Sequence, residues 1–265
     1  MFCYQTNTKN LSAVQCGRKD FWKGIRKVST PWSIETRRDI LRAIEEKDEE
    51  AKQRWIEHTD FRKFDLRTLK GLQTKTGKEK WKKKPIDKKL LAWADALKKS
   101  LPAFTFCCYE FDEDTFKKKD KEGKVVEVKE RRRQLKYCHL NGLVMLDIDH
   151  VEKPLDVWEK LQQHEALMKR VVLVHLTSSG HGIRIIFTAN IQEGNLADNM
   201  IVFAKILGYK PDSSCIDATR NSFAPKEDEI LFINEEKLFT YYDEEFDKKY
   251  TPMYREKQTQ PLYHQ

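Results

Sequence analysis

Apolar residues follow a helical spacing in the first part of the chain and a strand-like pattern afterwards. Up to residue 100 they recur at helical intervals, which predicts helices over residues 33–58 and 86–100. Ser33 is of a type preferred at helix N-caps, and Pro102 ends the second helix. From residue 103 onward, short continuous apolar runs predict buried strands.

In the second part of the chain, predicted strands alternate with predicted helices. Strands are expected over residues 103–111, 142–148, 171–176, 182–189 and 230–233. Helices are expected over residues 154–169 and 196–207. The charged residues 112–134 are expected to form an exposed hairpin or insertion. This order predicts an α/β (α+β) sandwich with an RRM-like core.

We therefore expect three parts along the chain. Residues 1–100 form a helical, Lys-rich region packed on or flanking the core, and residues 101–246 form that core. Within the first part, residues 59–84 are expected to be a surface loop or a mobile basic segment. Residues 247–265 are polar, which predicts a tail that frays or leads into a further domain.

Positive charge is concentrated in one segment. The chain carries a formal net charge of +8 and a pI near 9.0, a balance that many soluble proteins share but that favours an anionic partner such as nucleic acid. Residues 61–100 hold 14 basic and 4 acidic residues, so their net charge of +10 exceeds the total. The nucleic-acid-binding candidates are cations around one aromatic ring that can stack on bases: Lys80, Trp81, Lys82, Lys83 and Lys84. A solvated Lys-rich surface anchored by Trp81 is the alternative.

Cysteine usage and hydropathy favour a cytoplasmic chain. None of the six cysteines forms a C-x-x-C pair or a zinc-binding pattern with histidine, as expected for reduced thiols. The apolar runs are too short to span a bilayer, and the N-terminus lacks a signal-peptide core, so we expect no membrane partner.

The strongest chemical signal is the acidic end of the strand in residues 144–150. Alternation along a strand places Asp147 and Asp149 on one face, where two carboxylates repel each other unless a cation lies between them. Mg²⁺ and Mn²⁺ prefer such oxygen ligands. His150 is either a further ligand or merely exposed. The alternative is a pair of strand-end acids that cap loop amides.

A second candidate site is the glycine-rich turn at residues 177–182. Gly180 and Gly182 let backbone amides approach an anion closely, and Arg184 on the next strand supplies a cation suited to a triphosphate. The nucleotide-binding candidates here are Ser178, Ser179, Gly180, His181, Gly182 and Arg184. A glycine hairpin with ordinary turn serines is the alternative. His175, inside the preceding apolar strand, is expected to be a satisfied core residue.

A third candidate segment, residues 211–225, contains two acids and a cation. Either Asp212 or Asp217 could complete a three-carboxylate metal site. Arg220 could bind nucleotide phosphates or hold one of the acids in place. The alternative is a polar loop with a local Asp–Arg pair, which contributes little energy.

The three segments, in this order, resemble motifs I, II and III of archaeo-eukaryotic primases and primase-polymerases. The resemblance is closest to the primase-like N-terminal domains of bacterial mobile-element proteins, the group called BT4734-like or VirE N-terminal, over about residues 90–234. It implies that Asp147 and Asp149 bind the metal. It also implies that Ser179 holds the phosphates of the incoming nucleotide.

The third motif and one departure from the family pattern complete this comparison. Asp212 matches the third acid best, since Arg220 then falls at the expected position downstream, and Asp217 is its competitor. Motif II of the family usually ends in histidine, where this chain has Arg184, and His181 lies three residues earlier. Arginine binds phosphate but does not titrate near neutrality, so nucleotide binding tolerates this change better than polymerase activity does.

The function implied by this resemblance is that of a DNA primase or primase-polymerase. Such an enzyme joins nucleoside triphosphates on a single-stranded DNA template with Mg²⁺ or Mn²⁺. The implied setting is replication or mobilisation of a mobile element, with a helicase as a fused domain or partner. Two alternatives remain: a nucleic-acid-binding module that guides a partner helicase, and a metal-dependent nuclease that uses the same acids.

Overall fold

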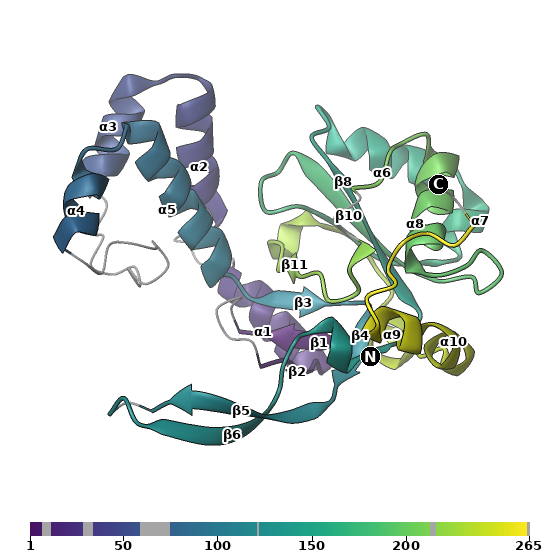
Figure 1. Cartoon of the computed structure of the whole chain (residues 1–265). Coiled ribbons are helices and arrows are strands. Elements are labelled where there is room, and N and C mark those ends of the chain that lie inside the picture. The colour runs from purple at the N-terminus through teal and green to yellow at the C-terminus, as the bar shows by residue number, and fades with distance from the viewer. Residues whose placement is uncertain (7–11, 29–33, 59–74, 121, 213–215, 264–265) are drawn as a thin grey trace. The chain divides into compact units, whose positions relative to one another are not determined.

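The chain folds into two compact units, shown in Figure 1 by a computed structural model. The structure describes all residues except 7–11, 29–33, 59–74, 121, 213–215 and 264–265. The first unit combines Met1–Lys27 with Pro102–Gln265, and the second is Val28–Leu101. The second unit thus ends one residue after the boundary expected at residue 100. The first 27 residues, however, belong to the same unit as the expected core.

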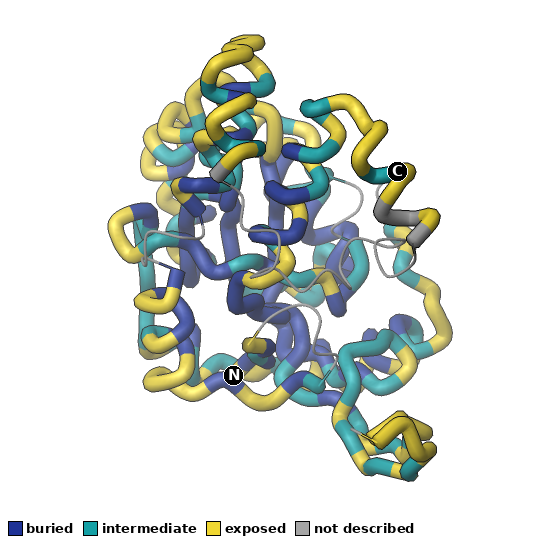
Figure 2. The backbone as a smooth tube through the Cα atoms, turned by 90° about the vertical axis from the view of Figure 1, so that its left-hand side faces the viewer, coloured by how far each residue is buried: buried dark blue, intermediate teal, exposed yellow. Residues whose placement is uncertain are grey.

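The largest sheet of the first unit contains the candidate acids. Its four strands are antiparallel and lie in the order β12 (Ile230–Ile233), β9 (Val171–Leu176), β10 (Gly182–Thr188), β8 (Leu143–Asp149). Buried positions follow β8, β9 and β10 almost without interruption, which explains their continuous apolar sequences (Figure 2). These strands confirm the expected ones to within one residue at each end, and β8 lies at an edge of the sheet.

Two helices cover one face of this sheet, α6 (Pro154–Gln162) and α8 (Leu196–Leu207) (Figure 1). Phe203 of α8 stacks on Phe187 of β10, with ring centroids 4.0 Å apart. Arg184 lies three positions before Phe187 on the same strand, so it points to the opposite face. In place of the single helix expected over residues 154–169, the structure has α6 and a second short helix, α7 (Glu165–Met168), separated by residues 163 and 164.

A smaller sheet explains why the N-terminus belongs to the first unit. Its strands lie in the order β11 (Ser222–Phe223), β3 (Ala103–Thr105), β1 (Cys3–Gln5), β2 (Val14–Gln15). Strands β1 and β2 pair with each other in antiparallel orientation. Phe2 beside β1 packs against rings from α1 (Arg18–Val28), β3 and α9 (Glu235–Thr240), with centroid distances of 5.8 to 6.1 Å to Phe21, Phe104 and Phe239.

Two pairs of strands complete the β structure of the first unit. They are β4 (Cys108–Phe111) with β7 (Cys138–Leu140), and β5 (Glu113–Lys119) with β6 (Val125–Arg131). The second pair confirms the exposed hairpin, while the single strand expected over residues 103–111 is split between β3 and β4. Short 3₁₀ helices η2 (Leu135–Tyr137) and η4 (Glu227–Glu229) precede β7 and β12.

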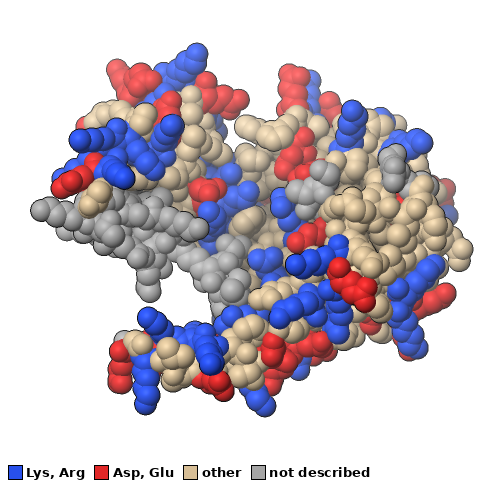
Figure 3. Space-filling view, in the orientation of Figure 1, with Lys and Arg blue, Asp and Glu red and all other residues tan. Residues whose placement is uncertain are grey.

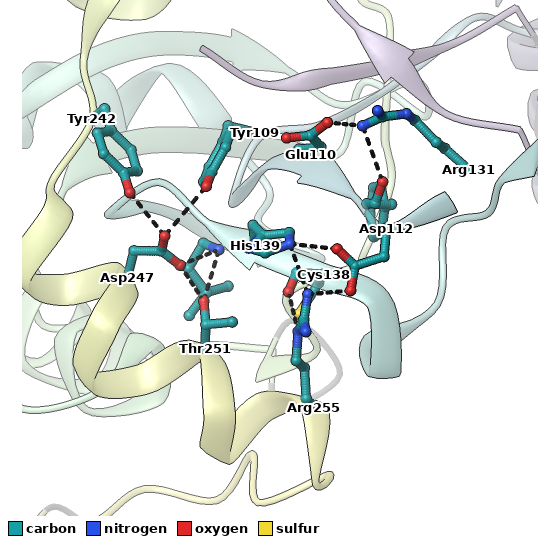
Figure 4. Close-up of polar contacts among 12 residues, drawn as sticks. Tyr109, Glu110, Asp112, Arg131, Cys138, His139, Tyr242, Asp247, Thr251 and Arg255 are labelled. Atoms are coloured by element: carbon teal, nitrogen blue, oxygen red, sulfur yellow. Dashed lines mark hydrogen bonds and ion pairs between the residues drawn. The ribbon is translucent and has the colours of Figure 1, made fainter. Parts of the chain in front are cut away.

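The expectation of a fraying polar tail was wrong for residues 247–255, because they lie in helix α10 (Glu244–Arg255). Its buried aromatic residues recur at i, i+4 and i+8, so a polar sequence still presents one apolar face: Phe246, Tyr250 and Tyr254. Polar bonds anchor the helix to β7 (Figure 4). The Asp247 carboxylate accepts the Leu140 amide at 3.2 Å, and Arg255 Nε donates to the Cys138 carbonyl at 2.9 Å.

The second unit consists of α2 (Ile34–Glu45), α3 (Glu49–His58), α4 (Lys75–Lys82) and α5 (Ile86–Ser100). The last of these confirms the expected helix over residues 86–100. The single helix expected over residues 33–58 is interrupted, because Lys47 adopts φ of 53° and Asp48 caps α3 by accepting the Ala51 amide at 2.9 Å. The expected basic loop was wrong for residues 75–82, which form α4, and its residues 59–74 lie outside the described part.

Two further findings concern membrane-spanning helices and cysteines among the described residues. No helix in them combines the length and apolar composition needed to cross a bilayer. Their five cysteines are buried thiols that are not joined in disulfides: Cys3, Cys16, Cys107, Cys108 and Cys138. Cys215 lies outside the described residues.

Candidate functional site

Three carboxylates from two distant segments meet at the end of the edge strand β8. One oxygen each from Asp147, Asp149 and Asp212 lies within 4.8 Å of those of the other two. Asp147 is buried, Asp149 is exposed and Asp212 is intermediate. The Asp212 amide donates to the Asp147 carbonyl at 3.2 Å, so the loop after α8 is attached directly to β8.

The donor set of this cluster fits Mg²⁺ or Mn²⁺. All three groups are carboxylates, the hard oxygen ligands that these cations prefer. Three like charges at such distances repel one another, and a divalent cation among them removes that cost. The graded burial suits a site that keeps solvent or substrate ligands on its exposed side, as Mg²⁺ sites usually do.

The end of α8 explains how Asp212 reaches the strand. Gly208 follows the last helical residue with φ of 77°, the left-handed conformation that ends many helices. Its amide bonds to the Lys205 carbonyl and the Tyr209 amide to the Ala204 carbonyl, which closes the last turn. Asp212 then lies beside β8, only four residues after the glycine.

Gly182 at the start of β10 gives the Asp149 carboxylate its space. The two residues are paired across β8 and β10. A Cβ atom at position 182 would lie 2.3 Å from Asp149 Oδ1 and 2.9 Å from the Ile148 carbonyl oxygen. The sequence suggested that this glycine lets backbone amides approach a phosphate. In the structure its missing side chain makes room for a candidate metal ligand.

The turn between β9 and β10 is held by its own hydrogen bonds. Gly180 adopts φ of 80°, and its amide donates to the Thr177 carbonyl at 2.9 Å. The Thr177 and Ser179 hydroxyl oxygens lie 3.0 Å apart, and the His181 amide lies 3.4 Å from Ser179 Oγ. Ser178 is buried and His181 is exposed. The turn therefore presents the half-buried Ser179 and Gly180 in a fixed arrangement next to the acids.

Arg184 is bonded to a member of the acidic cluster. It lies directly opposite Asp147 on β8, and its Nη2 forms a hydrogen-bonded ion pair with Asp147 Oδ2. Both side chains are buried, with 9% and 1% of their surfaces exposed. The sequence suggested a cation for a triphosphate at this position. In the structure this guanidinium is paired with Asp147, a candidate metal ligand, and neutralises its charge.

His175 lies on the other side of Arg184, in the same row across the sheet. Burial, together with the positive charge of Arg184, lowers the pKa of His175 to about 4. Its Nδ1 lies 2.7 Å from the Leu176 carbonyl oxygen, so Nδ1 carries the proton, and Nε2 accepts from Ser222 Oγ at 3.2 Å. The expectation of a satisfied core histidine is confirmed.

The third segment separates its two acids. The Asp217 carboxylate accepts the amide and the hydroxyl of Thr219, both at 2.8 Å, and its carbonyl accepts the Arg220 amide. It therefore closes a turn and lies outside the described three-acid cluster. Arg220 Nη2 lies 3.9 Å from Asp212 Oδ2, and 44% of the Arg220 side chain is exposed. The structure brings Asp212 and Arg220 to the site together.

Arg133, two residues after the end of β6, is a residue that the sequence did not single out. Its Nη1 donates to the Thr219 carbonyl at 2.6 Å, which ties it to the turn that precedes Arg220. Burial lowers the pKa of Arg133, while the nearby Asp217 opposes that shift. In the sequence it is the third of three consecutive arginines, and no pattern distinguishes it from the other two.

The nucleic-acid-binding candidates lie in the second unit, at α4 and the turn after it. Lys80, Lys82, Lys83 and Lys84 are exposed and Trp81 is half-buried. Lys84 Nζ lies 5.0 Å from the centroid of the Trp81 ring, a cation–π contact. Basic side chains of this unit gather around the described part of α4 at the left of Figure 3. Four further basic residues of the segment 61–100, at positions 62, 63, 67 and 70, lie outside the described residues.

Comparison with known proteins gives one match. A model of the family described as "BT4734-like, N-terminal domain" matches residues 96–232, just over half of the chain. The matched segment contains the three acids, the glycine turn, Arg184 and Arg220. No curated protein and no solved structure matches the chain.

Proposed function

We propose, for a chain that belongs to the BT4734-like N-terminal domain family, a metal-dependent nucleotidyl-transfer function of the primase or primase-polymerase type. The observation that supports it most is the meeting of three carboxylates beside a glycine turn and two arginines. An RRM-like primase-polymerase core is part of this proposal. It is supported by a four-stranded antiparallel sheet with helices on one face and the acids facing away from them.

Each residue of the site has a role in this proposal. Asp147, Asp149 and Asp212 hold the divalent cation, and in the free protein Arg184 pairs with the buried Asp147. The hydroxyl of Ser179 and the amides of its turn donate to the phosphates of a nucleoside triphosphate. Once bound, Mg²⁺ or Mn²⁺ supplies positive charge that favours deprotonation of a 3′-hydroxyl and offsets the charge of the leaving pyrophosphate.

Arg220 adds an exposed cation at the rim of this site. Its guanidinium lies near Asp212 and is open to solvent, so it can contact phosphate oxygens without leaving the loop that Asp217 closes. Planar guanidinium groups bind phosphates through two parallel hydrogen bonds. Arg133 positions this loop through the Thr219 carbonyl.

DNA is the proposed partner, and the second unit is the proposed place of binding. The exposed lysines after α4 neutralise backbone phosphates, while Trp81 offers a ring on which an unpaired base stacks. The family resemblance adds a helicase, as a fused domain or a separate partner, in replication or mobilisation of a mobile element.

Primer synthesis on a single-stranded template tests the catalytic proposal. We expect synthesis by the full chain with nucleoside triphosphates and Mn²⁺ or Mg²⁺, and a loss of about 100-fold or more in Asp149→Asn, since metal-derived stabilisation is worth several kcal/mol. Asp149 is exposed, so this variant keeps its fold. Asp228→Asn is the matched control, since 72% of its side chain is exposed. Binding without incorporation would favour the binding module, and metal-dependent cleavage would favour the nuclease.

Salt dependence of DNA affinity tests the binding proposal separately. We expect affinity for single-stranded DNA to fall steeply with salt, and the double variant Lys83→Ala/Lys84→Ala to bind more weakly with a smaller salt slope. Lys169→Ala/Lys248→Ala removes the same charge from two lysines with 73% exposed side chains. Equal losses in both variants would show that only the total charge is important, and not the segment after α4.

A further inference from the structure

The site contains a positive charge of its own at the place where a metal ion would bind. Arg184 and Asp147 are paired across β10 and β8, and both are buried. The guanidinium donates to Oδ2 of a carboxylate that also belongs to the three-acid cluster. A divalent ion that approaches this cluster therefore competes with a cation already attached to one of its ligands.

Burial makes this competition strong. Charges inside a protein interact through a low effective dielectric constant, so a guanidinium and a divalent ion on one carboxylate repel each other appreciably. The neighbour of Arg184 on the other side, His175, is neutral near pH 7 and supplies no negative charge there. When a metal ion displaces the Arg184 guanidinium from Asp147, the guanidinium therefore finds no negatively charged partner by turning toward His175 on β9.

The glycine turn offers a different partner. Arg184 and Gly182 lie two positions apart on β10, on the same face and at a spacing of about 7 Å along the strand. An arginine side chain spans that distance by changing rotamers. Phosphates held at the turn by Ser179 would present negative charge within its reach, in place of the charge that it leaves on Asp147.

We infer that Arg184 couples metal binding to nucleotide binding, by pairing with Asp147 in the free protein and with nucleotide phosphates once a divalent ion occupies the three acids. This inference rests on the proposed nucleotidyl-transfer site. It gives Arg184 the role of a positioning residue that keeps metal affinity low until a polyphosphate arrives. Because coupling between two ligands is reciprocal, the metal ion in turn raises the affinity for the polyphosphate.

Mn²⁺ titration of the wild type and of Arg184→Met measures this coupling directly. Without polyphosphate, we expect Arg184→Met to bind Mn²⁺ about 10- to 100-fold more tightly than the wild type. Inorganic tripolyphosphate should raise the Mn²⁺ affinity of the wild type. In Arg184→Met this increase should be smaller, by about the same 10- to 100-fold factor. Tripolyphosphate chelates Mn²⁺ to the same extent in both experiments, so this contribution cancels in the comparison.

Two further variants separate the possible outcomes. Asp149→Asn should weaken Mn²⁺ binding in both backgrounds, which locates the ion at the three acids. Arg184→Lys keeps a charge with fewer donors, so it should bind Mn²⁺ with intermediate affinity, and it serves if Arg184→Met does not fold. Unchanged Mn²⁺ affinity in folded Arg184 variants, with Asp149→Asn still impaired, would overturn the coupling but leave the metal site. No Mn²⁺ binding at these acids, with or without tripolyphosphate, would reject the proposed function itself.

Discussion

A single methyl group added at Gly182 should disable the three-acid cluster without a change of backbone conformation. A Cβ atom there would lie 2.3 Å from Asp149 Oδ1 and 2.9 Å from the Ile148 carbonyl oxygen. The carboxylate would have to withdraw by about 1 Å to reach ordinary contact. The carbonyl belongs to β8 and is paired with β10, so it cannot move away as easily.

The expected size of the effect follows from these distances. Overpacking of this kind typically costs about 1–3 kcal/mol of folding stability. A displacement of about 1 Å at a catalytic group can lower activity by about 100-fold. Gly182→Ala should therefore lose Mn²⁺ affinity and primer synthesis to a much greater extent than it loses stability, because the atom that moves most easily is a metal ligand.

Isothermal titration with Mn²⁺, primer synthesis and thermal unfolding measure the three quantities on one preparation. Gly17→Ala is the matched control, since its added Cβ would meet the Asp20 carboxylate at an ordinary distance of 3.4 Å. Wild-type Mn²⁺ affinity and synthesis in folded Gly182→Ala would refute the reasoning. It would mean that Asp149 does not need its observed position.

Three other changes have definite expected outcomes. Asp212→Asn should reduce Mn²⁺ affinity, whereas Asp217→Asn keeps an acceptor for its turn and should bind Mn²⁺ as the wild type does; the reverse ranking in titrations would exchange their roles. His175 is neutral in the fold with a pKa of about 4, below its unfolded value, so its contribution is complete above about pH 6.5 and is lost as the pH falls toward 4. This histidine should lower the free energy of unfolding at pH 5 by about 2 kcal/mol relative to pH 7. In denaturant titrations at several pH values, the free energy of unfolding of His175→Gln should depend less on pH than that of the wild type. An equal pH dependence in both proteins would contradict the assignment. Tyr250→Ala should destabilise the chain by about 3–5 kcal/mol, against about 0.5 kcal/mol or less for the exposed Tyr263→Ala, and equal unfolding midpoints would argue against a packed α10.

Local periodicity determined most of the elements around the candidate site. Strand β9, helix α8 and strand β12 begin and end at the residues expected from the sequence alone. Strand β8 is shifted by one residue at both ends, and β10 ends one residue early. Each is either a short continuous apolar run or a helix with clear caps, such as Asn195 before α8 and Gly208 after it. Such signals need no knowledge of distant contacts.

Helix interruptions and the C-terminal helix were not predictable in the same way. Residues 33–58 and 154–169 keep a helical spacing across their breaks, so the pattern alone predicted one helix in each. The break near Lys47 and the cap at Asp48 consist of one or two ordinary polar residues. Helix α10 is polar overall, and its apolar face is recognised as buried only once the rest of the first unit provides a surface for it.

The residues of the candidate site likewise divide into those that local sequence predicts and those that only long-range contacts identify. The spacing of Asp147 and Asp149 on a strand is a local property, and the sequence alone placed both on one face. The choice between Asp212 and Asp217 depended on where the loop after α8 meets β8, which is a long-range contact. The bond from Arg184 to Asp147 depended on the register of β10 against β8, and a shift by one residue would have turned Arg184 to the opposite face. Composition and periodicity specify residue types and faces, whereas only tertiary packing specifies which faces and loop ends come together.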